Sequence, residues 1–132
     1  CYGPRLMAFS ALLIVHFRQS KRKTTQFLTD FLNTPCSAAS VVKMQTLVSE
    51  ALTQPHEDLR TALQSEFTVH MDETPTKQKN EKAWMWVATS CRIAVFAIFS
   101  SRAATAISHL LGEGFRGIVC CDRAKMYYTL KH

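Results

Sequence analysis

Apolar residues in the first half of the chain recur at spacings of three and four, the pattern of amphipathic helices. The first predicted helix follows Pro4, a residue that the first turn of a helix tolerates. Its apolar face comprises Leu6, Phe9, Leu13 and Phe17. Ser20 is the expected N-cap of a second helix. The apolar stripe of that helix comprises Phe27, Leu28, Phe31 and Leu32.

Two more helices are expected before residue 66. The sequence Asn33-Thr34-Pro35 ends the second helix, and a third begins near Ser37. The inward positions of the third helix are Val41, Met44, Val48 and Leu52. A fourth helix begins at Pro55. Residues 20–52 have the length and turn of a helix-turn-helix that reads DNA. A plain helical hairpin that buries apolar faces is the alternative interpretation.

The second half changes to an alternating pattern, which is typical of strands. Residues 67–71 form a short apolar run that ends at Asp72, and residues 76–82 are polar and resemble a turn. Residues 83–89 and 93–99 then alternate, with Trp84 and Trp86 on one face, and are predicted to form an antiparallel hairpin. We interpret that face as a packed sheet face rather than a base-stacking platform.

A helix and a last strand complete the predicted order β-β-β-α-β. Ser101 is expected to cap a helix that runs from Arg102 to Leu111 and stops at Gly112. Residues 117–122 form a fourth strand ending in Asp122. A right-handed crossover lets this strand lie parallel to the first. Asp72 alone is explained as a residue that ends a strand. The predicted strand order brings it to Asp122, and two facing carboxylates favour a metal site.

Charge and composition narrow the class of protein. With 132 residues, of which 47% are hydrophobic, the chain can form one compact domain or two small modules. Its formal charge of +6 permits a polyanionic partner. Five cysteines without a C-x-x-C pair indicate neither a disulfide framework nor a zinc site, and a reducing cytosol fits them best. The apolar run over residues 6–15 is too short for a membrane span. A start without Met predicts an excerpt of something longer.

Several motifs together resemble the insertion sequence 66 family of bacterial transposases. Val69-His70-Met71-Asp72-Glu73-Thr74 resembles its first-carboxylate motif, and Ala83-Trp84-Met85-Trp86-Val87 its aromatic strand. Ser101-Arg102, residues 111–119 and Asp122-Arg123 with Tyr127 continue the resemblance, and residues 2–52 resemble the helical region before the core. The chain departs from the family in residues 76–82, which lack the usual tryptophan and glycine, and in Cys120-Cys121.

The resemblance implies a fold and an activity. The fold is α/β, with a helical module in residues 1–65 and a partial ribonuclease-H-like core in residues 66–132. The implied activity is metal-dependent cleavage and strand transfer of DNA. Asp72 would bridge two Mg²⁺ or Mn²⁺ ions and Asp122 would hold one, since such hard ions prefer oxygen ligands. A glutamate expected on a later helix lies beyond residue 132, so the chain alone is expected to be inactive. The resemblance also implies DNA as partner, no membrane association and a homo-oligomeric working complex. The implied location is the bacterial cytoplasm, in association with the nucleoid.

The remaining candidates carry alternatives. Lys21, Arg22 and Lys23 are possible DNA contacts or a solvated helix start, and Arg102 and Arg123 are phosphate contacts or solvated charges. His70 shares a strand face with Asp72, where a core or hydrogen-bonded histidine is favoured over a ligand for hard ions. Glu73 should point to the opposite face, as a turn or supporting residue. The competing functions are a non-catalytic DNA-binding protein or inactive transposase remnant, and a ribonuclease-H-like nuclease.

Overall fold

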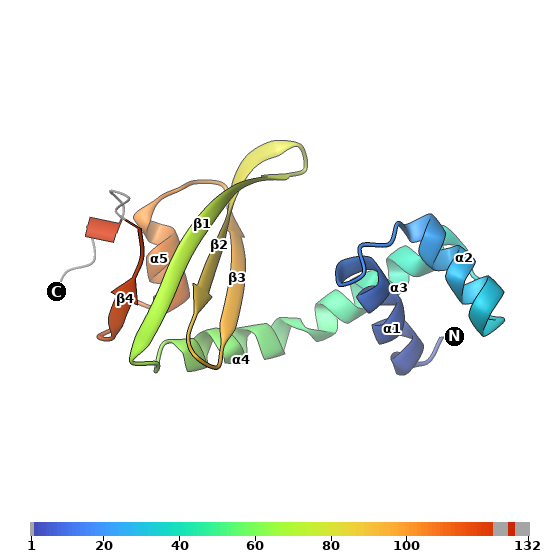
Figure 1. Cartoon of the computed structure of the whole chain (residues 1–132), viewed down its shortest axis with the longest axis horizontal. Helices are drawn as coiled ribbons and strands as arrows, with labels where there is room; N and C mark the ends of the chain where they lie inside the picture. The colour runs from blue at the N-terminus through green and yellow to red at the C-terminus, as the bar shows by residue number, and fades with distance from the viewer. Residues whose placement is uncertain (1, 123–126, 129–132) are drawn as a thin grey trace. The chain divides into compact units, whose positions relative to one another are not determined.

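A computed structural model of the chain describes residues 2–122 and 127–128 (Figure 1). The chain divides into two compact units, Cys1–Gln54 and Pro55–His132. The division falls near the start of the fourth helix rather than at its end. Leu63, near the end of that helix, is fully buried in the core of the second unit, which explains why the helix belongs there.

The first unit consists of three helices, α1 (Pro4–Val15), α2 (Lys21–Leu32) and α3 (Ala38–Ala51). The Ser20 side chain accepts a hydrogen bond from the backbone N–H of Lys23 at 3.2 Å, so the predicted N-cap is confirmed. Ser37 caps α3 in the same way through the N–H of Ser40. The unit has a small core of Leu28, Val41 and Met44, which are packed against apolar side chains of α1.

Four apolar positions expected to face inward in this unit are exposed: Phe17, Phe31, Leu32 and Leu52. Phe17 lies beyond the end of α1 at Val15, so the helical spacing no longer controls its direction. Only a narrow part of the α2 stripe, centred on Leu28, has neighbours to cover it, and Phe31 stacks instead on Phe27. Helical periodicity identified the elements but overstated the width of the covered face.

The second unit contains α4 (Thr53–Leu63), β1 (Thr68–Gln78), β2 (Glu81–Thr89), β3 (Ala94–Phe99), α5 (Ala104–Leu111) and β4 (Ile118–Cys120). The sheet order is β3-β2-β1-β4. The first three strands pair antiparallel, and β4 pairs parallel with β1 (Figure 1). The predicted order β-β-β-α-β and the neighbouring of the first and last strands are therefore confirmed. The chain is an α/β protein with a mixed sheet.

The first strand is longer than the sequence predicted. Residues 76–82 were expected to form a turn, but β1 continues to Gln78, which lies opposite Glu81. Lys79 and Asn80 both have positive φ, as a tight two-residue hairpin turn requires, so pairing extends to the tip. Pro75 is tolerated because β4 pairs only with residues 68–70 and leaves this part of β1 with a free edge.

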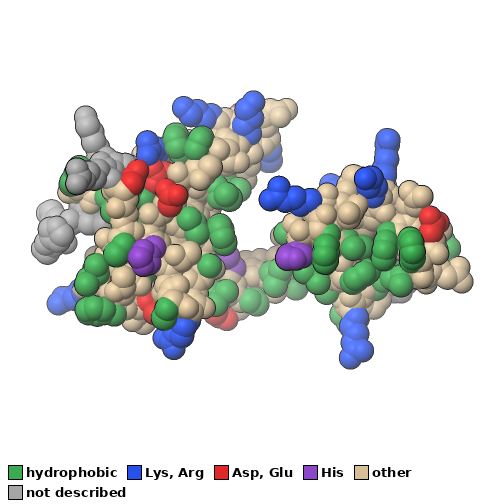
Figure 2. Space-filling model, in the orientation of Figure 1, with side chains coloured by type: hydrophobic (Ala, Val, Ile, Leu, Met, Phe, Trp, Pro, Cys, Tyr) green, Lys and Arg blue, Asp and Glu red, His purple; other side chains and the backbone are tan. Residues whose placement is uncertain are grey.

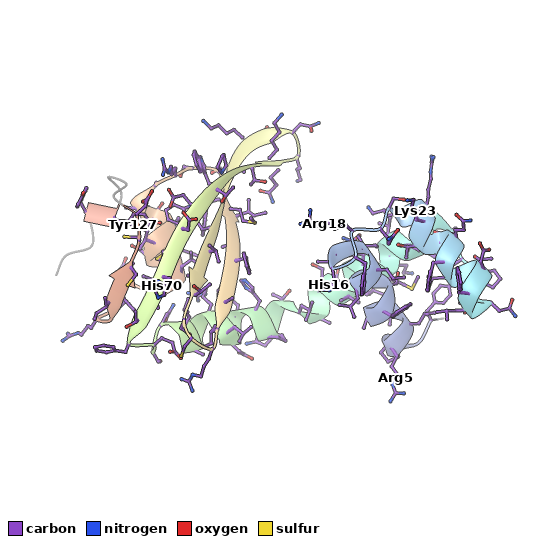
Figure 3. All side chains as sticks on the ribbon, in the orientation of Figure 1. Arg5, His16, Arg18, Lys23, His70 and Tyr127 are labelled. Atoms are coloured by element: carbon purple, nitrogen blue, oxygen red, sulfur yellow. The ribbon has the colours of Figure 1, made fainter. Side chains whose placement is uncertain are left out.

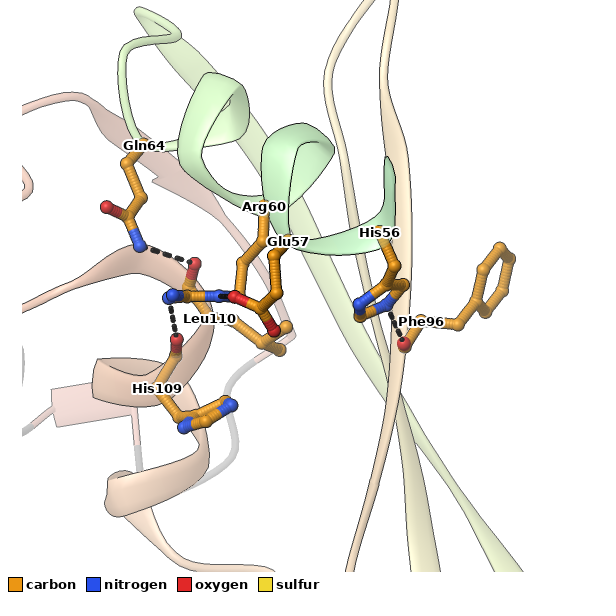
Figure 4. Close-up of polar contacts among 7 residues, drawn as sticks. All are labelled: His56, Glu57, Arg60, Gln64, Phe96, His109 and Leu110. Carbon is orange, nitrogen blue, oxygen red and sulfur yellow. Dashed lines mark hydrogen bonds and ion pairs between the residues drawn. The ribbon is translucent and has the colours of Figure 1, made fainter. Parts of the chain in front are cut away.

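The ends of two helices meet on the buried face of the sheet. The core there contains Leu63 of α4, four residues of α5, and inward residues of β1, β2 and β3. In Figure 4, the Arg60 guanidinium donates to the carbonyl of His109 at 2.8 Å, and the Gln64 amide donates to that of Leu110 at 3.4 Å. These bonds satisfy carbonyls in the last turn of α5, which lack partners within the helix. His56 contacts the Phe96 carbonyl of β3 at 2.9 Å.

The start of α5 differs from the prediction. The helix begins at Ala104 with Ala103 at the N-cap position, and no side chain caps it, so the expected role of Ser101 is wrong. Arg102 precedes the helix, and its guanidinium binds Glu73 of β1. The predicted stop at Gly112 is confirmed, where φ is +76°. Among the described helices, none is long and apolar enough to cross a membrane.

Candidate functional site

Asp72 lies in the middle of β1, on the face of the sheet opposite the helices. Side chains along this strand alternate, with Val69, Met71 and Glu73 buried and His70 and Asp72 exposed. The expectation that Asp72 ends the strand is wrong, because pairing with β2 continues past it and sets it opposite Val87. Its Oδ1 accepts a hydrogen bond from the backbone N–H of Glu73 at 2.9 Å. His70 shares the exposed face with Asp72, as predicted.

Asp122 lies two residues beyond the end of β4 and is exposed. In the parallel pairing of β4 with β1, Ile118 lies opposite Thr68 and Cys120 opposite His70. The prediction that the last strand ends at Asp122 is wrong, because its pairing stops at Cys120. Residues in register on adjacent parallel strands point to the same face of a sheet. If the same offset continued two residues beyond the strand, Asp122 would lie opposite Asp72.

The surroundings of the two acids are partly apolar. Phe96, Ile98 and Met85, on the same open face of β2 and β3, are 55%, 47% and 38% exposed. Figure 2 shows acidic side chains gathered on the visible surface of this unit, among apolar ones. Within residues 2–122 and 127–128, no three His, Cys, Asp or Glu side chains are placed to hold a metal ion. The described residues alone therefore supply no full ligand set for a metal ion.

On the buried face, directly beside Asp72, Glu73 forms a small polar network. Its side chain is only 1% exposed. The Arg102 Nε donates to Glu73 Oε1 at 2.7 Å, and a second nitrogen of the same guanidinium contacts that oxygen. The Tyr127 hydroxyl donates to Glu73 Oε2 at 2.6 Å. The prediction that Glu73 points away from Asp72 is confirmed, but its burial and its two partners were missed. Strand alternation was the only available signal.

Two aromatic rings of β2 support this network. The Arg102 guanidinium lies over the Trp84 ring at 5.0 Å from its centroid. The Tyr127 ring meets that of Trp86 edge-on at 6.1 Å. Trp86 is fully buried in the core and Trp84 packs against it, so the predicted packed face is confirmed. Both aromatic side chains of β2 thus fix groups that bind Glu73.

The electrostatics of the network follow from burial and hydrogen bonding. Burial, together with the hydrogen bond to Glu73, raises the pKa of Tyr127 well above its usual value, so the hydroxyl keeps its proton. The hydrogen bond to Glu73 raises the pKa of Arg102, and the negative charge of Asp122 adds to this effect. Burial chiefly raises the pKa of the Cys121 thiol, with a further contribution from Asp122. The Asp122 carboxylate thus acts on both groups that hold Glu73.

The predicted DNA-contact residues lie in different places. Lys21, Arg22 and Lys23 form the exposed first turn of α2. In Figure 3, Arg18 and Lys23 project from one side of the first unit and Arg5 from the opposite side. Basic side chains therefore surround that unit rather than forming one continuous face.

The two predicted phosphate contacts of the second unit have different outcomes. Arg102 is 41% exposed at its side chain but bonded to Glu73, so a phosphate would share its guanidinium with that carboxylate. Arg123 lies outside the described residues.

These features together define an α/β protein that has a mixed sheet, with Asp72 in β1 and Asp122 two residues after the parallel strand β4, and a three-helix unit with a basic turn. The family model described as "Transposase IS66 family" matches residues 1–132. The chain therefore belongs to the IS66 family of transposases, as its motifs predicted, and the family implies DNA as a partner. Comparison with curated proteins and with solved structures gave no significant match.

Proposed function

We propose that Asp72 and Asp122 are metal-binding carboxylates of a DDE transposase that cleaves and joins DNA strands. The observation that supports the proposal is the parallel pairing of β4 with β1, whose offset, continued two residues past Cys120, would set Asp122 opposite Asp72. Neighbouring strands lie about 4.8 Å apart, close to the separation of about 4 Å between the ions of two-metal sites. In this proposal the second unit is the first part of a ribonuclease-H-like core.

The donor chemistry suits the proposed ions. Mg²⁺ and Mn²⁺ prefer carboxylate oxygens, and both acids are exposed enough to meet a ligand. When bound, the ions would activate the attacking oxygen and stabilise the leaving oxygen of an in-line displacement at phosphorus. Asp72 and Asp122 would orient them and offset part of their positive charge, while the remaining charge would attract the anionic DNA backbone. His70 is exposed on the same face as Asp72, so the interpretation of it as a core residue is wrong, and it is not proposed as a ligand.

Two carboxylates hold a metal weakly, so the chain by itself should bind Mn²⁺ without transferring strands. The working complex is proposed to contain several copies, in which the basic turn of Lys21, Arg22 and Lys23 contacts DNA phosphates. Such contacts act through charge and position the duplex without reading its sequence. A set of neutralising substitutions there should weaken DNA binding and reduce its dependence on salt.

Paramagnetic broadening tests the metal site. Mn²⁺ titrated into the ¹⁵N-labelled chain should broaden the amide signals near Asp72 and Asp122 at the same metal concentration. Asp72→Asn and Asp122→Asn should each abolish this joint broadening. Asp30→Asn, which changes an exposed acid of α2 in the first unit, is the matched control and should leave it unchanged. Broadening that ignores both acids, or that persists in both variants, would overturn the proposal.

A non-catalytic DNA-binding protein is the second candidate, and the exposed basic turn of α2 favours it. Under that function, substitution of Lys21, Arg22 and Lys23 would abolish DNA binding, while Mn²⁺ would leave the signals of both acids unchanged. The same titration therefore separates the two candidates.

A further inference from the structure

The network around Glu73 joins two segments that carry the proposed ligands. Glu73 directly follows Asp72 in β1, and its backbone N–H donates to the Asp72 carboxylate at 2.9 Å. Tyr127 belongs to the chain beyond Asp122, and its hydroxyl donates to Glu73 Oε2 at 2.6 Å. Figure 3 places Tyr127 beside β1, beyond the end of β4. A single side chain thus connects the two acid-bearing segments.

Such a connection is needed because β4 is short. Its pairing with β1 covers only residues 118–120 and ends two residues before Asp122. The hydrogen bond of the Ile118 N–H to the Phe67 carbonyl, at 2.7 Å, supports the start of the strand and not its end. Backbone pairing of β4 therefore ends before Asp122, and the contact of Tyr127 with Glu73 lies on the other side of Asp122 in the chain.

Both carboxylate oxygens of Glu73 are used in the connection. Arg102 occupies Oε1 and Tyr127 occupies Oε2, and the side chain is 1% exposed. A buried carboxylate that loses a partner is costly, so each donor is held strongly in place. The rings of Trp84 and Trp86 restrict the two donors further. These contacts hold the Glu73 side chain on the face of β1 opposite Asp72.

We propose that Glu73, Arg102 and Tyr127 form a positioning clamp that holds the segment bearing Asp122 in register with Asp72. The effect of the clamp on metal binding rests on the proposed function. Its effect on the stability of β4 does not. None of the three side chains is proposed to touch the metal or the DNA. They act on the site by tying Tyr127, which follows Asp122 in the chain, to Glu73, which follows Asp72 in β1.

The test compares Tyr127→Phe with Tyr128→Phe in the full 132-residue chain. Tyr127→Phe removes one hydroxyl and keeps the ring against Trp86, whereas Tyr128 is 74% exposed and provides the matched control. Amide hydrogen exchange is measured for Val119 and Cys120 of β4 and for residues of the β2–β3 pair. Mn²⁺ affinity is measured from the broadening of the Asp72 and Asp122 signals.

Tyr127→Phe should lower the protection of the β4 amides about tenfold relative to those of β2–β3, and weaken Mn²⁺ binding by about tenfold, as loss of supporting hydrogen bonds does at metal sites. Tyr128→Phe should change neither. Equal loss of protection across the whole sheet, or no loss in β4, would overturn the clamp. If the unsubstituted chain shows no Mn²⁺ broadening at the acids, the proposed function fails, and the exchange measurement still decides the clamp by itself.

Glu73→Gln provides a second, conservative test. The amide keeps an acceptor for Tyr127 and loses the charge that pairs with Arg102, so protection of β4 should fall less than in Glu73→Leu, which removes both acceptors. The same order is expected for Mn²⁺ affinity. Equal effects of the two substitutions would mean that Glu73 contributes only packing volume, which contradicts the clamp.

Discussion

Gly117→Ala should disturb the pairing that brings the two acids together. Gly117 directly precedes β4, and a Cβ at this position would lie 2.7 Å from the Phe67 carbonyl oxygen and 2.8 Å from that of Glu66. These atoms are backbone and cannot rotate away. The Phe67 carbonyl is also the acceptor for Ile118 at the start of the strand. Extra volume in such a site costs about 1 to 3 kcal/mol, because the backbone must shift.

The assay is urea unfolding followed by tryptophan fluorescence. Both tryptophans, Trp84 and Trp86, lie in β2, so the signal reports on the second unit. Gly114→Ala is the matched control, since a Cβ there meets nothing within 4 Å. Gly114→Ala only reduces the flexibility of the unfolded chain, so this substitution should stabilise the folded protein by up to about 1 kcal/mol. A Gly117→Ala protein within about 0.5 kcal/mol of the Gly114→Ala protein would refute the steric reasoning, since surface changes fall in that range.

Three further outcomes are expected. Leu63→Ala should destabilise the second unit by about 2 to 5 kcal/mol in the same urea assay, because the side chain is fully buried in its core; a cost below about 1 kcal/mol would mean that the end of α4 is not packed there. Ser20→Ala should cost about 1 kcal/mol of helix stability, seen as a loss of helical circular dichroism, whereas Ser20→Gly should cost a few tenths; equal losses would exclude the cap. Tyr127 faces Glu73, Cys121 and Asp122, and its pKa in the folded protein is higher than in the unfolded chain. The folded state therefore holds the hydroxyl proton more tightly, and this contribution to stability is complete only while the unfolded tyrosine is also neutral. Stability should therefore fall as pH rises above about 10, the ordinary tyrosine value, and fall less in Tyr127→Phe.

Local sequence signals determined most of the elements. Ser20 and the turn before Ser37 fixed the helix starts of the first unit, because capping depends on residues only three positions apart. Alternation identified the strands, and the crossover rule placed β4 beside β1. The placement of Asp72 on one strand and of Asp122 just after its parallel neighbour followed from that order. These inferences needed only short-range chemistry and one topological rule.

Tertiary structure decided the features that depend on distant partners. The length of β1 was set by β2, which continues to pair to the hairpin tip although residues 76–82 are polar. The outward position of Phe31 was set by how little of α2 its neighbours cover. Burial of Glu73 was set by Arg102 and Tyr127, whose donors come from elsewhere in the chain. The sequence by itself therefore determined the elements, their order and the candidate acids, whereas register, strand length and the partners of a buried charge required the folded chain.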